Sequence, residues 1–166
     1  MRIGVGIDGR TFINADGKKN FPDGEIFTGP EETVTEGWVK FTYPAIYQGR
    51  EVEGVELEFK GGRVVRAGAK KGEDFLVEML DTDAGARTLG EFAIGANAGI
   101  QKFTRSILFD EKIGGTIHMA VGAGYPDTGS KNVSAVHWDL ICDTRDGTAI
   151  TVDSVPFYRS GEFLVK

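Results

Sequence analysis

Glycine is the feature that most limits what this chain can fold into. It supplies 24 of the 166 residues, about twice the usual share of roughly 7%, and it is spread along the whole sequence. Only 5 prolines accompany it, so the composition is not that of a low-complexity segment. Glycines scattered in this way indicate many tight turns. Many turns in a chain of this length favour short strands and a β-rich fold.

The segments between the turns mostly alternate apolar and polar residues, which is the pattern of strands with one buried face. Alternation is clearest in residues 55–59, where the odd positions are apolar and the even positions are glutamate. Gly61-Gly62 follows after Lys60 and predicts a hairpin turn. Near the N-terminus, residues 2–5 and 10–14 are expected to form strands on either side of a turn at Asp8-Gly9.

One clear helix is predicted, beginning after Gly72. Four apolar residues recur there at helical spacing: Phe75, Leu76, Met79 and Leu80. Residues 101–112 allow one or two further helical turns, and later strands are expected at residues 136–142, 149–152 and 162–165. Because no linker or repeat divides the chain, we expect residues 1–166 to form a single α+β domain of mostly antiparallel strands with few helices.

Composition argues against several classes of function. The net charge is −6 and no basic stripe appears, which argues against nucleic-acid binding. No apolar run approaches the roughly 18 residues of a membrane helix, so no membrane partner is expected. Cys142 is the only cysteine and cannot form an internal disulfide. A reducing compartment is therefore the natural location, and we predict the cytoplasm.

Both histidines lie in one stretch, residues 117–139. His137 and Asp139 are two residues apart in the run V-H-W-D-L-I, so in a strand they project from the same face while Trp138 points away. His118 lies in a similar run, G-T-I-H-M-A-V, in which its two neighbours would face a core and the imidazole the opposite side. Two strands that each lend a histidine to one side of a sheet are typical of a metal site.

Two carboxylates stand out by their context. Glu25 follows P-D-G and Glu91 follows L-G, and each enters an apolar, strand-like segment where an unpaired charge would be costly to bury. Either residue could instead lie at a strand end with its carboxylate in solvent. Together with His118, His137 and Asp139, however, they form a set that suits two divalent cations sharing a bridging carboxylate, and such a site supports hydrolysis. The alternative is that the histidines are ordinary core or surface residues.

Four motifs in order resemble the C-terminal part of the M29 metallo-aminopeptidases, the aminopeptidase T and aminopeptidase S group. They are N-F-P-D-G-E-I-F-T-G-P, L-G-E-F-A-I-G-A-N, D-E-K-I-G-G-T-I-H-M-A-V-G and S-A-V-H-W-D. The resemblance runs from about residue 9 to about residue 153. It implies two divalent metal ions (zinc, cobalt, manganese or magnesium) held by Glu25, Glu91, His118, His137 and Asp139.

The resemblance also assigns roles near the metals. Tyr125 stands seven residues beyond His118, at the place of a family tyrosine that is a ligand or a catalytic group. A phenol there could donate a hydrogen bond to the oxyanion of a tetrahedral intermediate. Glu91 is the first choice for a general base in addition to its role as a ligand.

The activity implied is that of a metallo-aminopeptidase, which releases N-terminal residues from peptides with a free N-terminus. A homodimer is implied as well. Family members carry an additional N-terminal α/β domain that is absent from this sequence, so we expect the domain alone to bind metal but to hydrolyse peptides poorly. The alternatives are a metal-binding domain without catalysis and an isolated fragment with no activity of its own.

Overall fold

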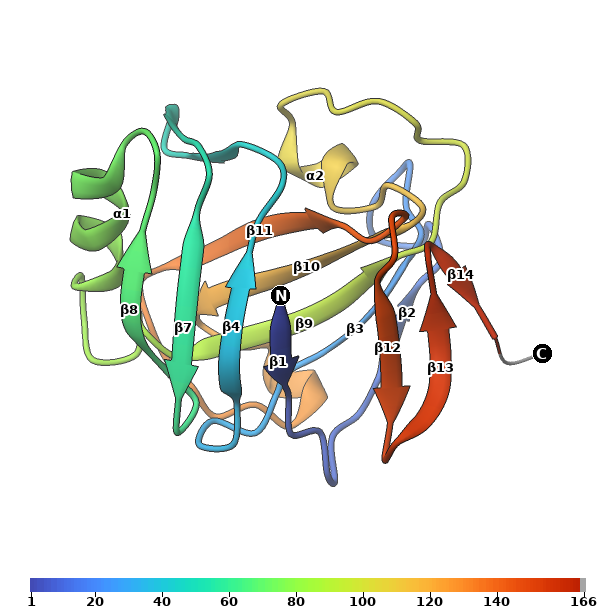
Figure 1. The fold of residues 1–166 in the computed structure, drawn as a ribbon, viewed down its shortest axis with the longest axis horizontal. Helices are drawn as coiled ribbons and strands as arrows, with labels where there is room; N and C mark the ends of the chain where they lie inside the picture. The colour runs from blue at the N-terminus through green and yellow to red at the C-terminus, as the bar shows by residue number, and fades with distance from the viewer. Residues whose placement is uncertain (165–166) are drawn as a thin grey trace.

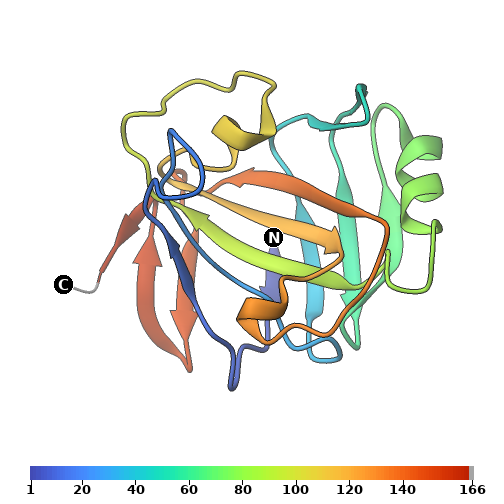
Figure 2. The ribbon, with the colours of Figure 1, turned by 180° about the vertical axis from the view of Figure 1, so that it is seen from behind.

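Two antiparallel sheets cross over one another and enclose the main core (Figures 1 and 2). The computed structural model describes residues 1–164. The first sheet has the strand order β1-β4-β7-β8, with β1 at Arg2–Gly4, β4 at Glu36–Lys40, β7 at Glu56–Lys60 and β8 at Arg63–Gly68. The second has the order β11-β10-β9-β3-β2, with β11 at His137–Asp143, β10 at Thr116–Gly122, β9 at Leu89–Gly95, β3 at Glu25–Thr28 and β2 at Ile13–Ala15.

Smaller elements complete the domain. Two short sheets pair β5 (Ala45–Tyr47) with β6 (Arg50–Val52), and β13 (Val155–Arg159) with β12 (Ala149–Val152) and β14 (Glu162–Phe163). The helical segments are α1 (Glu73–Leu80), α2 (Ile107–Asp110) and the 3₁₀ turn η1 (Pro126–Thr128). The predicted α+β class, with mostly antiparallel strands and few helices, is confirmed. Within residues 1–164, no helix has the length and apolar character needed to cross a membrane.

The core lies between the two large sheets and follows from the alternation of their strands. Leu57 and Phe59 of β7 are buried, whereas the glutamates between and beside them are exposed. Met119 and Trp138 meet this layer from β10 and β11. The hairpin predicted between β7 and β8 is present, and Gly61 and Gly62 adopt φ angles of 56° and 76°. Only glycine adopts such angles readily, which is why this pair can close a two-residue turn.

The predicted helix is confirmed as α1, which buries the four apolar residues that indicated it: Phe75, Leu76, Met79 and Leu80. This helix packs against β8 and β6 beside the first sheet (Figure 1). The ambiguous segment 101–112 contains α2, which is a single helical turn.

Two predicted strands have bounds that differ from the observed ones by two or more residues at one end. In place of a strand at residues 10–14, the structure has β2 at Ile13–Ala15, because the preceding residues are held elsewhere. The Thr11 amide donates to the Thr128 carbonyl oxygen at 3.0 Å, and the Arg10 side chain pairs with Glu32 at 2.6 Å. The predicted strand at 162–165 corresponds to β14 at Glu162–Phe163, and Val165 lies outside the described residues.

Candidate metal centre

The face of the second sheet that points away from the core carries the candidate ligands. Side chains alternate along each strand, so the apolar residues of β9, β10 and β11 face the first sheet and the residues between them face the other way. In the register of these strands, Ala120 lies opposite Asp139 on one side and opposite Glu91 on the other. His118 lies opposite Ala93. The small alanines leave room in which longer polar side chains converge.

Glu91 is the centre of the group. One of its carboxylate oxygens lies 3.2 Å from His118 Nε2, and the other lies 3.5 Å from His137 Nε2. His118 Nε2 is also 3.2 Å from Glu25 Oε2, and His137 Nε2 is 3.7 Å from Asp139 Oδ1. The structure therefore brings together the five residues predicted as ligands, although they come from four different strands. Their role as ligands remains a prediction.

Three overlapping groups have ligand atoms that all lie within 4.8 Å of one another. They are Glu25 with Glu91 and His118, Glu91 with His137 and Asp139, and Glu111 with His118 and Asp139. Glu25 Oε2 is buried and has no hydrogen-bond partner among residues 1–164. A buried carboxylate oxygen that has an imidazole nitrogen 3.2 Å away but forms no hydrogen bond, beside a second carboxylate, fits the oxygen and nitrogen ligands of a divalent cation.

The backbone orients His137 for such a role. Its Nδ1 lies 2.8 Å from the carbonyl oxygen of Ala123 and donates to it in the tautomer that leaves Nε2 free. Hydrogen bonds of this kind fix the ring and the tautomer of metal-binding histidines. Nε2 is the nitrogen that faces Glu91 and Asp139.

Sequence reasoning missed two residues of this site, Glu111 and Lys112. Lys112 is buried, with its side chain 1% exposed. Its ammonium group lies 2.6 Å from Glu25 Oε1, forms an ion pair with Glu111 and lies 3.9 Å from Asp23 Oδ1. A signal was present, because D-E-K immediately precedes the segment I-G-G-T-I-H. Only the second and third of these residues reach the site, since Asp110 accepts hydrogen bonds from Thr104 instead.

The protonation properties follow from burial and from these charges. Burial raises the pKa of Glu91, and the charge of Asp139 adds to the increase. Burial and Asp139 likewise raise the pKa of Glu111 to about 7. Glu25 differs from these two carboxylates. Burial acts to raise its pKa, but His118 and Lys112 outweigh burial and leave the pKa lowered.

Metal binding should strengthen as the pH rises from about 5.5 to about 7.5, because ligands must lose protons before they bind a cation. Burial opposes the charging of His118, but Glu25 and Glu91 outweigh it and raise the pKa of His118 well above its usual value. Glu111 also holds its proton up to about 7. Calorimetric titration with zinc in two buffers of different ionisation enthalpy should reveal proton release. The titration is made at about pH 5.5 and at about pH 7.5, and an equal zinc affinity at these two pH values would contradict the prediction.

In the metal-free protein, the stability of the fold should depend on pH in the opposite direction to the metal affinity. A carboxyl whose pKa is raised from 4.5 to about 7 on folding stabilises the fold below the lower value, and this contribution is lost as the pH rises through the higher one. The raised pKa of His118 acts in the same direction, because its contribution is present at low pH and is lost as the pH rises through the folded-state pKa. The stability that these two groups contribute should therefore fall as the pH increases, as measured by urea unfolding with a chelator present.

Tyr125 lies beside the site, in the loop after β10. Its ring meets those of His137 and Phe27 edge-on, with centroids 5.2 and 5.4 Å apart. Burial and the charges of Glu91 and Asp139 raise the pKa of Tyr125 to about 12. Without metal, the phenol therefore keeps its proton at neutral pH and can donate a hydrogen bond. Its role as a ligand or as a catalytic group remains a prediction.

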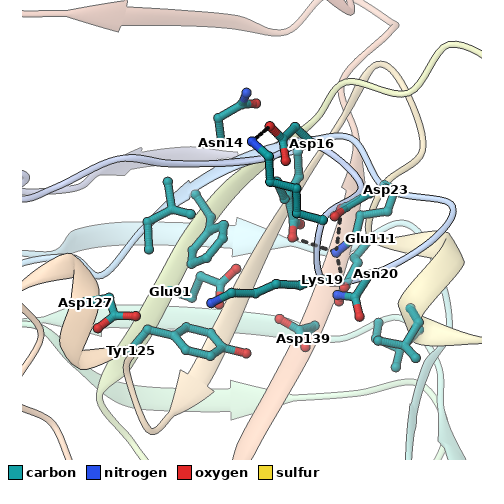
Figure 3. Close-up of a pocket in the computed structure, with 18 of the residues that line it drawn as sticks. Asn14, Asp16, Lys19, Asn20, Asp23, Glu91, Glu111, Tyr125, Asp127 and Asp139 are labelled. Atoms are coloured by element: carbon teal, nitrogen blue, oxygen red, sulfur yellow. Dashed lines mark hydrogen bonds and ion pairs between the residues drawn. The ribbon is translucent and has the colours of Figure 1, made fainter.

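A cavity of about 510 Å³ opens over these groups (Figure 3). The loop between β2 and β3 forms one wall with Asp16, Lys19 and Asn20, and Tyr125 and Asp127 form the opposite wall. Ligand-binding pockets usually measure about 300 to 1,000 Å³, so the cavity could hold a small peptide.

Fold and site together define a β-rich domain with a candidate centre for divalent metal. The family described as thermophilic metalloprotease (M29) matches residues 1–163. The chain belongs to this M29 family, as the four motifs predicted.

Among curated proteins, aminopeptidase T of Thermus aquaticus is 33% identical in a match 168 positions long. The match covers 88% of this chain and 40% of the relative. Aminopeptidase 2 of Geobacillus stearothermophilus is also 33% identical, over 87% of this chain and 40% of the relative. The chain thus spans about two fifths of the length of these relatives.

Two solved structures are similar. Wild-type AmpT from Thermus thermophilus has a TM-score of 0.76 and 30% sequence identity, and the match covers 98% of this chain and 47% of that one. A 2,5-dihydroxypyridine dioxygenase from Pseudomonas putida KT2440 has a TM-score of 0.68 at 17% identity, over 86% of this chain and 44% of that one. At that identity, the likeness shows a shared fold alone.

Proposed function

We propose that this chain is the metal-binding catalytic domain of an aminopeptidase, which releases N-terminal residues from peptides through two divalent metal ions. The observation that carries the proposal is the position of Glu91, whose two oxygens face the two histidines at 3.2 and 3.5 Å. A carboxylate placed in this way can bridge two cations. The M29 relatives support the reaction class, since they are named aminopeptidases.

The residues divide into two proposed ligand sets that share Glu91. Glu25 and His118 would complete the first set, and His137 and Asp139 the second. Zinc, cobalt, manganese and magnesium are the candidate ions. When bound, such ions lower the pKa of water and polarise a carbonyl group.

The carboxylates would transfer protons, and the phenol would donate a hydrogen bond. Glu91 is the first candidate from the sequence to take a proton from the attacking water and return it to the leaving amine, a role that requires one of its oxygens not to be bound to a cation. Glu111 is a second candidate, because in the metal-free protein its pKa of about 7 lies near neutral pH, where a general base is most effective. Tyr125 keeps its proton and would donate a hydrogen bond to the oxyanion.

Turnover by this chain alone is expected to be weak compared with that of a full-length relative. Metal capture needs only the local geometry of the ligands, whereas catalysis also needs the substrate held in place. A displacement of about 1 Å can cost roughly a hundredfold in rate. A homodimer and a cytoplasmic location remain predictions, the first from the family resemblance and the second from the single cysteine.

An assay of aminoacyl-nitroanilide hydrolysis with added cobalt tests the proposal, together with the melting temperature with and without metal. We expect divalent metal to raise the melting temperature and a chelator to reverse the rise. Glu91→Gln should remove both this stabilisation and any turnover. Glu58→Gln is a matched control, because Glu58 is exposed on β7 of the other sheet.

The outcomes separate the alternatives. Metal-dependent stabilisation without turnover, even at high protein concentration, would favour a metal-binding domain without catalysis. A melting temperature that does not respond to any of the four metals would contradict the proposed centre itself.

A further inference from the structure

We propose that Lys19 binds a carboxylate of the substrate, so that the site prefers peptides carrying a carboxylate within one residue of the scissile bond. This inference rests on the proposed peptidase function and adds a substrate class to it. The carboxylate could be the C-terminus of a dipeptide or the side chain of an acidic N-terminal residue.

The position of Lys19 is the first observation. It belongs to the loop between β2 and β3 and lines the same cavity as Glu91, Tyr125 and Asp139. In Figure 3 its side chain extends across the cavity, on the side of Glu91 and Tyr125. Its ammonium group therefore lies in the same cavity as the candidate metal centre.

The second observation is that the other two lysines that line the cavity form ion pairs, whereas Lys19 does not among residues 1–164. Lys18 is paired with Asp16 at 2.6 Å. Lys112 is buried at the base of the cavity in its ion pairs with Glu25 and Glu111. Lys19 forms no ion pair with any residue in the range 1–164. An unpaired lysine at the entrance of a cavity can offer its full charge to a ligand.

The charge of the centre determines which ligand Lys19 would accept. Four carboxylates face the cavity floor, Glu25, Glu91, Glu111 and Asp139, and Asp23 lies beside them, 3.9 Å from Lys112. Two divalent cations together with Lys112 would balance the charge of these five carboxylates. The Lys19 ammonium would then face no excess of negative charge at the floor, and an anionic substrate group between the floor and Lys19 would be attracted to the ammonium. A peptide carboxylate near the scissile bond is the substrate group placed to fill this position.

Binding of non-hydrolysable analogues tests the inference without relying on turnover. Two pairs of dipeptide analogues, each with a reduced peptide bond, are titrated calorimetrically into the zinc-loaded protein. The first pair is Leu-Gly and its C-terminal amide, and the second is Glu-glycinamide and Gln-glycinamide. In at least one pair, we expect the carboxylate form to bind about fivefold more tightly, the upper range for one partly exposed ion pair. The pair that shows the preference identifies the source of the carboxylate.

Two neighbouring lysines provide a matched comparison. Lys19→Gln should abolish the preference and Lys19→Arg should retain most of it, whereas Lys18→Gln should leave it unchanged. Melting temperatures of the three variants check that each is folded. Absence of a preference in both pairs for the wild-type protein would overturn the inference, and so would a preference that persists in Lys19→Gln.

The result is separable from the fate of the proposed function. A carboxylate preference that depends on Lys19, without nitroanilide hydrolysis, would uphold the binding site and contradict the peptidase. Hydrolysis without the carboxylate preference would support the peptidase and contradict the binding site at Lys19.

Discussion

Lys112→Met is expected to destabilise the metal-free protein by about 3–5 kcal/mol, the usual cost of removing one partner from a buried ion pair. The Lys112 side chain is 1% exposed, and its ammonium lies 2.6 Å from Glu25. It also pairs with Glu111 and lies 3.9 Å from Asp23. Without the ammonium, these carboxylates would face one another in a poorly solvated space, so they would repel or take up protons.

The ion pair between Lys40 and Glu56 supplies a control for this prediction. Its two charged groups are also 2.6 Å apart, but the side chains are 49% and 54% exposed. Because water and salt screen such a pair, Lys40→Met should change the free energy of unfolding little. Both variants are measured by urea unfolding in the presence of a chelator. A similar small change for both would show that burial of Lys112 does not matter as proposed.

Added metal should recover part of the stability lost in Lys112→Met. A divalent cation near Glu25 and Glu111 would supply positive charge in place of the missing ammonium, and a ligand that binds only the folded state raises its stability. The recovery is measured as the difference in unfolding midpoint with and without zinc. No recovery would argue against Glu25 and Glu111 as groups that face the metal.

The second large effect separates two adjacent residues of β11. Trp138→Ala should cost about 3–5 kcal/mol of stability, as is usual for a large buried aromatic residue. Trp138 is 1% exposed and lies against Tyr47 and Phe75, with ring centroids 5.3 and 5.8 Å apart. Its contacts lie in the core between the sheets, so the metal affinity of the folded protein should change little.

His137→Ala should have the opposite pattern. Loss of even an outer partner of a metal-binding histidine costs about 10- to 100-fold in affinity, so loss of the imidazole should cost at least about 100-fold. His137 is partly exposed, and its ring contacts the site rather than the core, so the metal-free stability should be nearly unchanged. Competition with a chromogenic chelator measures the affinity, and urea unfolding measures the stability. If neither variant changed either quantity, the assigned faces of β11 would be wrong.

Lys112 also explains how Glu25 is presented to the site. The ammonium binds Oε1 of Glu25 at 2.6 Å and leaves Oε2 directed at His118, 3.2 Å from its Nε2. The same contact helps to keep Glu25 ionised, since its pKa is lowered despite burial. An ionised carboxylate with one oxygen already fixed is better prepared to bind a cation than one that must first lose a proton.

The sequence alone determined which side chains share a face. A strand has a period of two residues, so the spacing of His137 and Asp139 placed them together and sent Trp138 into the core. The same rule predicted that His118 points away from the core formed by its neighbours, and the buried positions of Ile117 and Met119 confirm this. The four motifs also identified the M29 family, whose match covers residues 1–163.

Only the tertiary structure decided which of these side chains come together. Glu25, Glu91 and His118 are far apart in the chain, and they converge because β3, β9 and β10 are neighbours in one sheet. The register, with Ala120 between Glu91 and Asp139, makes the space that they share. Glu111 and Lys112 join them from outside the sheet, where no strand periodicity predicts the direction of a side chain. Local spacing fixes the direction of a side chain within its own strand, but strand pairing and burial fix its neighbours, and those neighbours determine the pKa values of the site.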